Sequence, residues 1–376
     1  MTLKQTIIRN LLNIFGWRTS RHIVVIESDD WGSIRMPSKE VYDRLLKAGI
    51  RVDKCHYCTN DSIASEEDLT LLFELLNSFK DKNGNSAVIT ANAVVANPDF
   101  EKIKESDFST YFYKRIDQGL KEIKGCEKVL DLWMQGHANG CFRLQSHGRE
   151  HLNVARWMHY LQGDYPETRF AFDNGVYGLS TNLTSEKRKS FLPAFDFENK
   201  QEEKQANEIV VDGLRIFEEL FGIKSTSFIA PNYVWGKSLE AAIAGAGVKY
   251  IQGTLVARYR NSEGEKNGKR YRYMGKKNAL GQIDLSRNAM FEPSEFPGKD
   301  WVDACLADIA MAFRWHHPAI ICSHRVNFVG CINSENRDRN LHSLKLLLSK
   351  ILQKWPDVEF MSSDQLGNII TNNNGK

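Results

Sequence analysis

The sequence lacks several features that would point to familiar classes of protein. Its formal net charge is only +3 over 376 residues, and it contains neither a zinc-finger framework nor an aromatic stacking motif, so nucleic acid is a poor candidate partner. No segment rich in proline, glycine and serine divides the chain, and no internal repeat is present. With 42% hydrophobic and 26% charged residues, the composition is typical of a globular protein, and we expect a single domain over residues 1–376.

The N-terminus also lacks a continuous hydrophobic run. Polar and basic residues interrupt the apolar ones there, as in Ile7, Ile8, Arg9 and Leu11, and no small-residue cleavage site follows. We therefore expect neither a signal peptide nor a transmembrane segment. The pattern predicts an amphipathic helix within residues 1–20. Such a helix usually packs on its own domain, and the face of a membrane is the alternative.

Cysteine is infrequent and forms no disulfide framework. The seven cysteines are an odd number, and Cys141, Cys305 and Cys322 lie in apolar or strand-like contexts, which is typical of reduced thiols. Cys55 and Cys58 have the spacing of half a zinc site or of a redox motif, but no second pair follows at a usable distance. We interpret them as two thiols in a surface segment, and we expect a cytoplasmic protein, with peripheral attachment to a membrane as the alternative.

Short β-prone runs alternate with helical stretches along the chain, which is the pattern of an α/β protein with a mostly parallel sheet. The predicted strands are 22–27, 87–90, 141–145, 169–172, 226–229, 249–252, 319–322 and 358–361. The predicted helices are 39–48, 66–80, 108–124, 152–162, 201–221, 237–246, 301–315 and 337–354. Long insertions are expected at about 55–140, 163–200 and 257–278. The last of these is densely basic, which indicates either a solvated hairpin or a rim that attracts an anionic substrate.

Four of the strand-like runs end in polar side chains that can bind a metal or transfer a proton. These side chains are Asp29 and Asp30, His147 and His151, Asn232 and Tyr233, and His324 and Arg325. In an α/β barrel the C-terminal ends of the strands converge on one face, so we expect these residues to meet.

Adjacent carboxylates after a buried strand repel each other and lose hydration, so each needs a partner. Successive residues of an extended chain point in opposite directions, so one of Asp29 and Asp30 can bind a metal while the other serves as a base. Capping of the following helix is the alternative.

The histidines, like the aspartates, each have a functional and a non-functional interpretation. His147 and His151, four residues apart, can reach one ion from one side of a helical turn, and Gly148 between them permits an unusual backbone; a chance pair is the alternative. A neutral imidazole at His324 can exchange a proton at physiological pH; a histidine with a structural role in the core is the alternative.

Together these segments resemble the polysaccharide deacetylase family, the metal-dependent carbohydrate esterases that include chitooligosaccharide and peptidoglycan deacetylases. The resemblance runs in order from about residue 22 to about residue 370. It implies a distorted (β/α) barrel of about seven parallel strands with long loop insertions. It further implies Asp29 as catalytic base, Asp30, His147 and His151 as ligands of one divalent ion, and His324 as the acid that protonates the leaving group. Zinc is the expected ion, and cobalt, nickel, manganese and iron are alternatives for such ligands.

The sequence departs from the family pattern in two places. The first motif usually reads Thr-Phe-Asp-Asp-Gly, whereas here Glu27 and Ser28 precede the aspartates and Trp31 is inserted before Gly32. The third motif normally begins with an arginine that orients the catalytic Asp, and residues 228–233 contain none. Arg325 and Arg149 are the candidates for that charge, and the chain is expected to be a divergent member.

We therefore expect a deacetylase that removes an acetyl group from a glycan or glycan precursor by means of a metal-activated water. The substrate is an acetylated carbohydrate, anionic if the basic run attracts it, and Trp31, Asn232, Tyr233 and Arg325 are the candidate residues that bind it. A degenerate member that binds carbohydrate without turnover is the main alternative, and hydrolysis of another amide, such as a formyl group or a cyclic imide, is a third. The presence of both Asp29 and His324 favours catalysis, because a binding protein needs neither a base nor an acid. The sequence predicts no oligomeric state.

Overall fold

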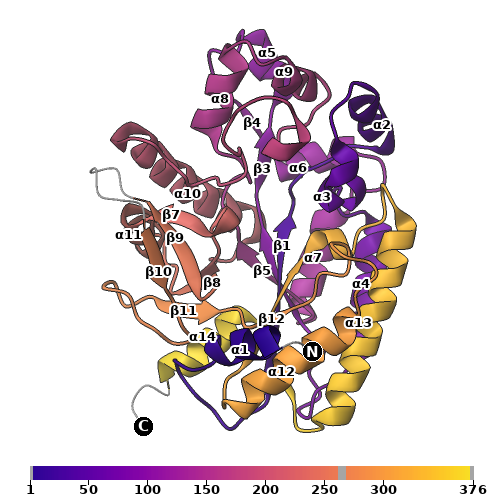
Figure 1. Cartoon of the computed structure of the whole chain (residues 1–376), viewed down its shortest axis with the longest axis vertical. Helices are drawn as coiled ribbons and strands as arrows, with labels where there is room; N and C mark the ends of the chain where they lie inside the picture. Colours follow the sequence, from indigo (N-terminus) through magenta and orange to yellow (C-terminus); the bar gives the residue numbers. More distant parts are fainter. Residues whose placement is uncertain (1–2, 261–267, 373–376) are drawn as a thin grey trace.

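A curled parallel sheet organises the molecule. The computed structural model describes residues 3–260 and 268–372 (Figure 1). Within these residues the main sheet has nine strands, in the order β11-β8-β6-β5-β2-β1-β13-β12, with β14 paired to the start of β1. The strands are β1 (Ile23–Trp31), β2 (Ile89–Ala93), β5 (Phe142–Ser146), β6 (Ser227–Phe228), β8 (Tyr250–Gly253), β11 (Ile283–Ser286), β12 (Ala289–Met290), β13 (Ala319–His324) and β14 (Glu359–Met361). The predicted distorted (β/α) barrel is confirmed, with nine strands in place of about seven.

The sheet is open between β11 and β12, which form its two edges although only two residues separate them in sequence. Arg287 and Asn288 span this gap. The backbone N–H of Arg287 donates to Gly253 O of β8, and Asn288 exchanges hydrogen bonds with Pro318 O and with the N–H of Ile320. These two residues therefore link the edges of the half-barrel and lie at its seam.

Strand β1 is the central strand, and all of its residues are buried. It pairs with β13 along its length, with β14 at its beginning and with β2 at its end, and the register with β2 shifts between Ser28 and Trp31. Within this irregularity Asp30 has φ 74°. The strand thus carries both aspartates into the interior and turns their side chains in different directions.

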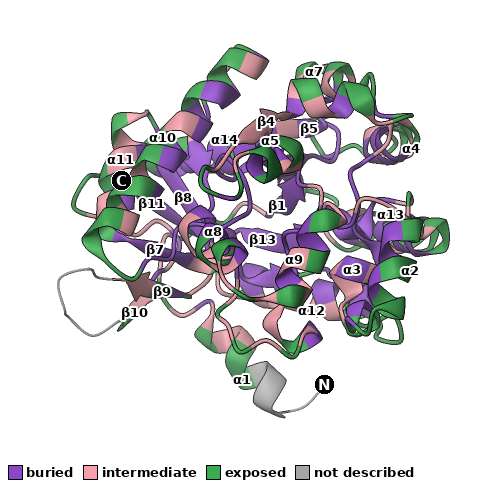
Figure 2. Ribbon diagram, turned by 90° about the horizontal axis from the view of Figure 1, so that it is seen from above, coloured by how far each residue is buried: buried purple, intermediate pink, exposed green. Residues whose placement is uncertain are grey.

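Helices cover the outside of the sheet and bury one face each (Figures 1 and 2). They include α2 (Lys39–Lys47), α4 (Glu66–Asn77), α7 (Val129–Ala138), α8 (Val154–Gln162), α10 (Lys200–Phe221), α11 (Lys237–Gly245), α12 (Trp301–Arg314), α13 (Ser334–Lys354) and α14 (Ser363–Asn372). Among the described residues, no helix is both long and apolar enough to span a membrane.

Several predicted elements were wrong. Residues 169–172 belong to helix α9 (Pro166–Asp173), which begins with a proline at its first turn, where the missing N–H costs nothing. The predicted helix 108–124 is replaced by β4 (Tyr113–Arg115), the short α6 (Ile116–Gly119) and a 3-10 turn at Leu120–Glu122, and its first residue, Phe108, has a positive φ. The expected insertion at 55–140 contains α4, β2 and α7, so most of it is part of the barrel itself.

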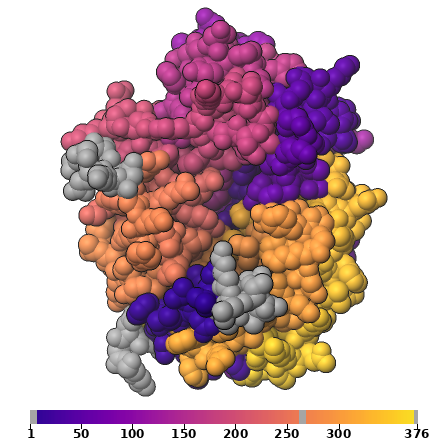
Figure 3. Space-filling view, in the orientation of Figure 1, coloured from indigo at the N-terminus to yellow at the C-terminus, as the bar shows by residue number. Residues whose placement is uncertain are grey.

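The two remaining irregular segments lie beside the barrel. Residues 163–200 connect α8 to α10 and contain α9. The basic segment forms an antiparallel hairpin of β9 (Val256–Arg260) and β10 (Gly268–Tyr271), which pairs with β7 (Val234–Gly236); its residues 261–267 lie outside the described part. The predicted N-terminal helix is shorter than expected, α1 (Leu3–Leu11), and lies on the surface beside α12 (Figure 3), where Arg9 pairs with Asp308.

Candidate metal centre and catalytic site

Asp30, His147 and His151 come together at the C-terminal ends of β1 and β5. The Nε2 atoms of His147 and His151 lie 3.5 and 3.4 Å from Oδ1 of Asp30. All three residues are buried, and this Oδ1 has no hydrogen-bond partner among the described residues. A buried carboxylate oxygen without a donor is costly, and two imidazole nitrogens beside it complete the ligand set of a divalent ion. The three residues therefore fit the metal site that the family resemblance implies.

Hydrogen bonds and backbone geometry orient these ligands. Nδ1 of His147 lies 2.9 Å from Ile229 O, and a hydrogen bond there directs Nε2 toward Asp30. Gly148 has φ 100°, as its position between the histidines suggested. Burial lowers the pKa of His151 to about 3, so its imidazole is neutral. Burial alone would raise the pKa of Asp30, but the nearby Arg35, which donates to its Oδ2 at 3.2 Å, and the histidines hold that pKa well below its usual value.

Asp29 lines the same cavity as this group and is held by Arg287. Arg287 donates from Nη2 to Oδ1 of Asp29 at 2.7 Å and from Nη1 to Oδ2 at 2.9 Å, and Asn92 donates to the same Oδ1. Burial tends to raise the pKa of Asp29, yet the charge and hydrogen bonds of Arg287 outweigh it and lower the pKa to about 2. The carboxylate of Asp29 is thus ionised throughout the physiological range.

His324 lies opposite Asp29 and is paired with Glu292. Its Nδ1 is 2.5 Å from Oε1 of Glu292, and its Nε2 is 3.8 Å from Oδ2 of Asp29. Asn327 donates to the second oxygen of Glu292. Burial would lower the pKa of His324, but the charge and hydrogen bond of Glu292 raise it well above its usual value. The side chain is therefore an imidazolium at neutral pH.

Glu292, Cys322 and His324 form a second group whose donor atoms lie close together. This group is explained without an ion. Burial raises the pKa of the Cys322 thiol, so the thiol stays neutral, and its sulfur accepts a hydrogen bond from Arg287 at 3.2 Å.

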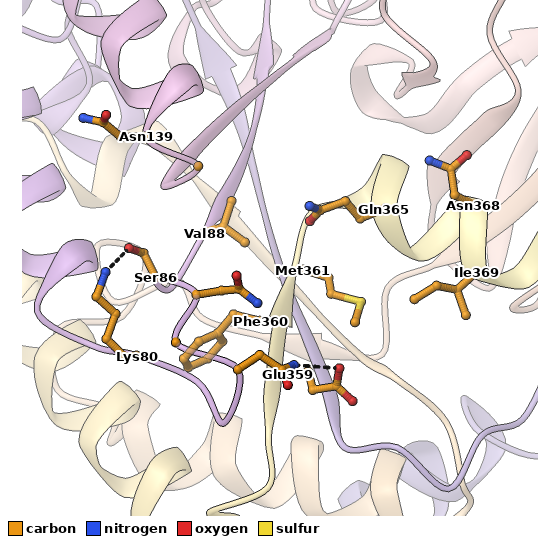
Figure 4. A pocket seen from close by; sticks show the side chains of 14 residues that line it. Lys80, Ser86, Val88, Asn139, Glu359, Phe360, Met361, Gln365, Asn368 and Ile369 are labelled. Carbon is orange, nitrogen blue, oxygen red and sulfur yellow. Dashed lines mark hydrogen bonds between the residues drawn. The ribbon is translucent and has the colours of Figure 1, made fainter.

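The Asp30, His147 and His151 group, Asp29 and His324 all line one cavity of about 240 Å³. It is lined by Asp29, Asp30, Arg35, Tyr57, His147, His151, Ser180, Leu192, Ala230, Asn232, Tyr233 and His324. A larger cavity, of about 510 Å³, lies at the opposite end of the strands, and its lining includes Lys80, Asn83 and Glu359 (Figure 4). None of the predicted site residues lines that second cavity, and Lys80 and Asn83 there donate to Ser86 and Glu359.

Two of the four predicted substrate-binding residues line the catalytic cavity. Asn232 and Tyr233 both have φ 56°, and the Tyr233 hydroxyl accepts a hydrogen bond from Arg287. Trp31 does not line it, because the shift in register at the end of β1 places the indole in the core, where it donates to Ser28 Oγ and packs edge-on against Phe142.

Arg325 does not line the cavity either. It is fully buried, donates from Nε and Nη2 to Oδ1 of Asp61 and from Nη1 to the backbone oxygen of Ser33, and so holds the turn after β13 in place. Arg149, the other candidate for the charge beside Asp29, pairs with Glu150 and Asp212 instead. Both candidates for the family's missing arginine were therefore wrong, and Arg287 makes that contact.

Sequence reasoning missed Arg35, Tyr57, Arg287 and Glu292. Residues 287–293 are polar enough to line a site and precede a helix, which is a weak signal, but this pattern assigns them no role. The pair Cys55 and Cys58 was interpreted as a surface segment. Cys58 is in fact buried, and Tyr57 between the two cysteines lines the cavity.

The basic run has partners of its own. Arg272 is 1% exposed and pairs with Asp284, and Arg270 pairs with Glu240. Among the described residues of the basic segment, 257–260 and 268–278, none lines the catalytic cavity. Arg270 and Arg272 therefore link the hairpin to α11 and β11 through these ion pairs.

Comparison with known proteins supports the fold. A protein from Parabacteroides distasonis assigned as a glycoside hydrolase/deacetylase superposes with a TM-score of 0.52 at 8% identity, over 95% of this chain and 73% of that chain. One from Pseudomonas aeruginosa PAO1 assigned as a polysaccharide deacetylase gives 0.47 at 12% identity (95% and 93%), and PuuE allantoinase gives 0.46 at 12% identity (96% and 94%). No protein-family model and no curated protein matches the sequence. The superposition on the Parabacteroides distasonis structure therefore supports the barrel that the resemblance to polysaccharide deacetylases predicted, and the low identity shows that the sequence is highly divergent.

Proposed function

We propose that this chain is a metal-dependent deacetylase that removes an acetyl group from a glycan or a glycan precursor. One observation carries the proposal. The buried Asp30, His147 and His151 group opens into the same cavity as Asp29 and His324, an ionised carboxylate and a cationic imidazole. A metal group, a base and an acid around one cavity are the parts needed to hydrolyse an amide or an ester.

Asp30, His147 and His151 would hold the divalent ion, and zinc is the ion that best suits two imidazoles and one carboxylate. When bound, such an ion lowers the pKa of a water molecule and polarises the acyl oxygen. The position of Arg35 on the other oxygen of Asp30 leaves Oδ1 for the ion.

Asp29 takes the proton of the attacking water. Its Oδ2 accepts one hydrogen bond, from Arg287, whereas Oδ1 accepts two, so Oδ2 has more capacity to receive the proton. A pKa of about 2 keeps Asp29 ionised at neutral pH, so its carboxylate is in the form that can accept a proton. Arg287 keeps the carboxylate ionised and fixes its orientation.

His324 donates a proton to the departing nitrogen or oxygen. Glu292 holds Nδ1, so Nε2 carries the proton that faces the cavity and Asp29. The backbone N–H of Tyr233 donates to Ala230 O, so the backbone amide of Asn232 is the candidate donor to the oxyanion. A protein that binds carbohydrate without turnover would not need this base and acid.

Metal analysis and acetate release test the proposal together. His147→Ala and His151→Ala should lose the ion, and Asp29→Asn should keep the ion and the fold but lose about 10²- to 10⁴-fold in activity. The exposed His342→Ala is a matched control and should retain both ion and activity. Full metal occupancy in both histidine variants, or near-normal turnover by Asp29→Asn, would refute the proposal. A panel that includes formamides and cyclic imides separates deacetylation from hydrolysis of another amide.

A further inference from the structure

Arg35 is a buried cation in the wall of the catalytic cavity, and most of its donors are not used. It is 8% exposed and lines the cavity beside Asp30. Among the hydrogen bonds between described residues it donates one, from Nη2 to Oδ2 of Asp30 at 3.2 Å, and its Nε is buried without a partner. A guanidinium has five N–H donors, and leaving buried donors unsatisfied is costly unless a ligand or water takes them.

Two other arginines near the site are engaged much more fully. Arg287 donates to Glu27, Asp29, Tyr233 and Cys322, and Arg325 donates twice to Asp61 and once to Ser33 O. Neither lines the cavity. The comparison distinguishes Arg35 as the guanidinium that faces the cavity with donors to spare.

The guanidinium of Arg35 is also held in position. Its Cζ lies 4.9 Å from the centroid of the Tyr57 ring, and its Nη2 donates to Oδ2 of Asp30 at 3.2 Å. An oriented guanidinium with free N–H groups matches the geometry of a carboxylate.

The size of the cavity limits the group that can enter it. The enclosed volume of about 240 Å³ is below the ~300–1,000 Å³ typical of sites for drug-sized ligands, so it suits a group the size of one sugar ring.

We propose that Arg35 is an anion-binding subsite, and that the substrate is a small acylated molecule with a carboxylate near the acyl group that is cleaved. The identity of the substrate rests on the proposed function, whereas the subsite itself is a property of binding. This assigns the selection of an acidic substrate to the cavity wall, in place of the basic hairpin.

Two pairs of ligands test the subsite, and in each pair only one ligand carries a carboxylate. They are N-acetylmuramic acid against N-acetylglucosamine, and N-acetylglycine against N-methylacetamide. Dissociation constants are measured by calorimetry with zinc-loaded protein in the Asp29→Asn background, so that turnover does not interfere. With Arg35 present, the acid of each pair should bind about 10- to 100-fold more tightly than its neutral partner. In Arg35→Gln this ratio should fall to near one while the neutral ligand binds as before, and Arg35→Lys should retain part of it.

Arg258→Gln is the matched control, because it removes the same charge from an exposed position of the hairpin and should leave the ratio unchanged. Zinc content is measured for every variant, and Arg35→Lys replaces Arg35→Gln in the comparison if the latter loses zinc. A ratio near one with Arg35 present, including no binding of either acid, overturns the subsite. So does a ratio that persists in Arg35→Gln, since the carboxylate would then be held elsewhere. If the ratio depends on Arg35 but no acetylated compound is hydrolysed, the subsite stands and the proposed function fails. If an acetylated compound is hydrolysed but the ratio does not depend on Arg35, the proposed function stands and the subsite fails.

Discussion

The guanidinium of Arg287 donates one N–H to each carboxylate oxygen of Asp29, at 2.7 and 2.9 Å, although 258 residues separate the two in sequence. Its Nε donates to Glu27 at 2.6 Å, so one arginine pairs with two carboxylates of β1. Arg287 lies in the two-residue seam between the edges of the sheet. Closure of the half-barrel and orientation of the candidate base therefore depend on the same residue.

Replacing Arg287 should impair turnover more than metal binding. In Arg287→Gln the carboxylate of Asp29 loses its oriented partner, and misplacement of a catalytic group by ~1 Å can cost ~10²-fold in rate. The pKa of Asp29, held at about 2 by Arg287 against the effect of burial, should rise. Because Asp29 acts as the ionised form, activity should then fall between pH 7 and pH 4 in the variant and stay level in the wild type.

Profiles of kcat/KM against pH, with zinc content measured at each pH, provide the test for Arg287, and Arg287→Lys should recover part of the rate. An unchanged acid limb in Arg287→Gln would contradict the role assigned to Arg287.

Glu292 should control the alkaline limit of activity. His324 acts as the protonated form, and Glu292 raises its pKa well above the usual value against the effect of burial. Activity should therefore persist above pH 6.5 and decline only as the pH passes the raised pKa. Glu292→Gln removes the charge, so the decline should begin at lower pH. Above the pKa of His324, each unit by which that pKa falls reduces the protonated fraction about tenfold.

The measurement for Glu292 is the ratio of kcat at pH 6 and pH 8. The exposed Glu335→Gln is the control and should behave as the wild type. If Glu292→Gln lowered kcat by the same factor at both pH values, the residue would have a structural role and His324 would not depend on its charge.

The five residues with assigned chemistry could be predicted because each follows a local signal. Asp29, Asp30, His147, His151 and His324 come at the ends of apolar runs, and parallel strands bring their carboxyl ends to one face. The structure places all five around one cavity. Strand assignment therefore sufficed to bring together residues that are up to 295 positions apart.

Arg287 and Glu292 could not be predicted in the same way. They flank β12, which has two residues, and follow β11, which has four. Runs this short carry almost no periodic pattern, and their place at the seam depends on pairing with β8 and β13, far away in sequence. A similar limit explains why the directions of Trp31 and Arg325 were not predicted. Each is adjacent to a site residue. The direction of Trp31 depends on a shift of register and that of Arg325 on a turn, and neither is visible in the composition.

Arg325 should be essential for stability and not for substrate selection. Arg325→Met leaves Asp61 buried without its partner, and breaking a buried ion pair from one side costs about 3–5 kcal/mol. Burial already raises the pKa of Asp61 above its unfolded value. The ionised form is therefore disfavoured in the folded state, and the deficit should be largest at neutral pH and shrink as falling pH protonates Asp61. Urea denaturation at pH 7 and pH 5 measures this loss of stability.

The double variant Arg325→Met/Asp61→Leu should recover much of the lost stability, and the exposed Arg258→Met should change stability by no more than about 0.5 kcal/mol. A single variant as stable as the wild type would rule out this role.

Gly213 of α10 should determine how closely this helix approaches the metal-binding loop. A Cβ at Gly213 would lie 2.6 Å from the backbone N and 2.9 Å from Cα of Arg149, between the two histidines of the candidate metal centre. Backbone atoms cannot move aside as a flexible side chain can, so Gly213→Ala should displace the loop. Overpacking of this kind costs about 1–3 kcal/mol, against a gain of about 1 kcal/mol in helix propensity. We expect lower stability together with weaker zinc binding.

Gly245 in α11 is the matched control, since a Cβ there meets no atom within 4 Å, and Gly245→Ala should stabilise the protein by up to about 1 kcal/mol. Zinc affinity by competition with a chelator and unfolding in urea are measured for both variants. If Gly213→Ala bound zinc as tightly as Gly245→Ala, the close packing of α10 would not be what fixes the positions of His147 and His151.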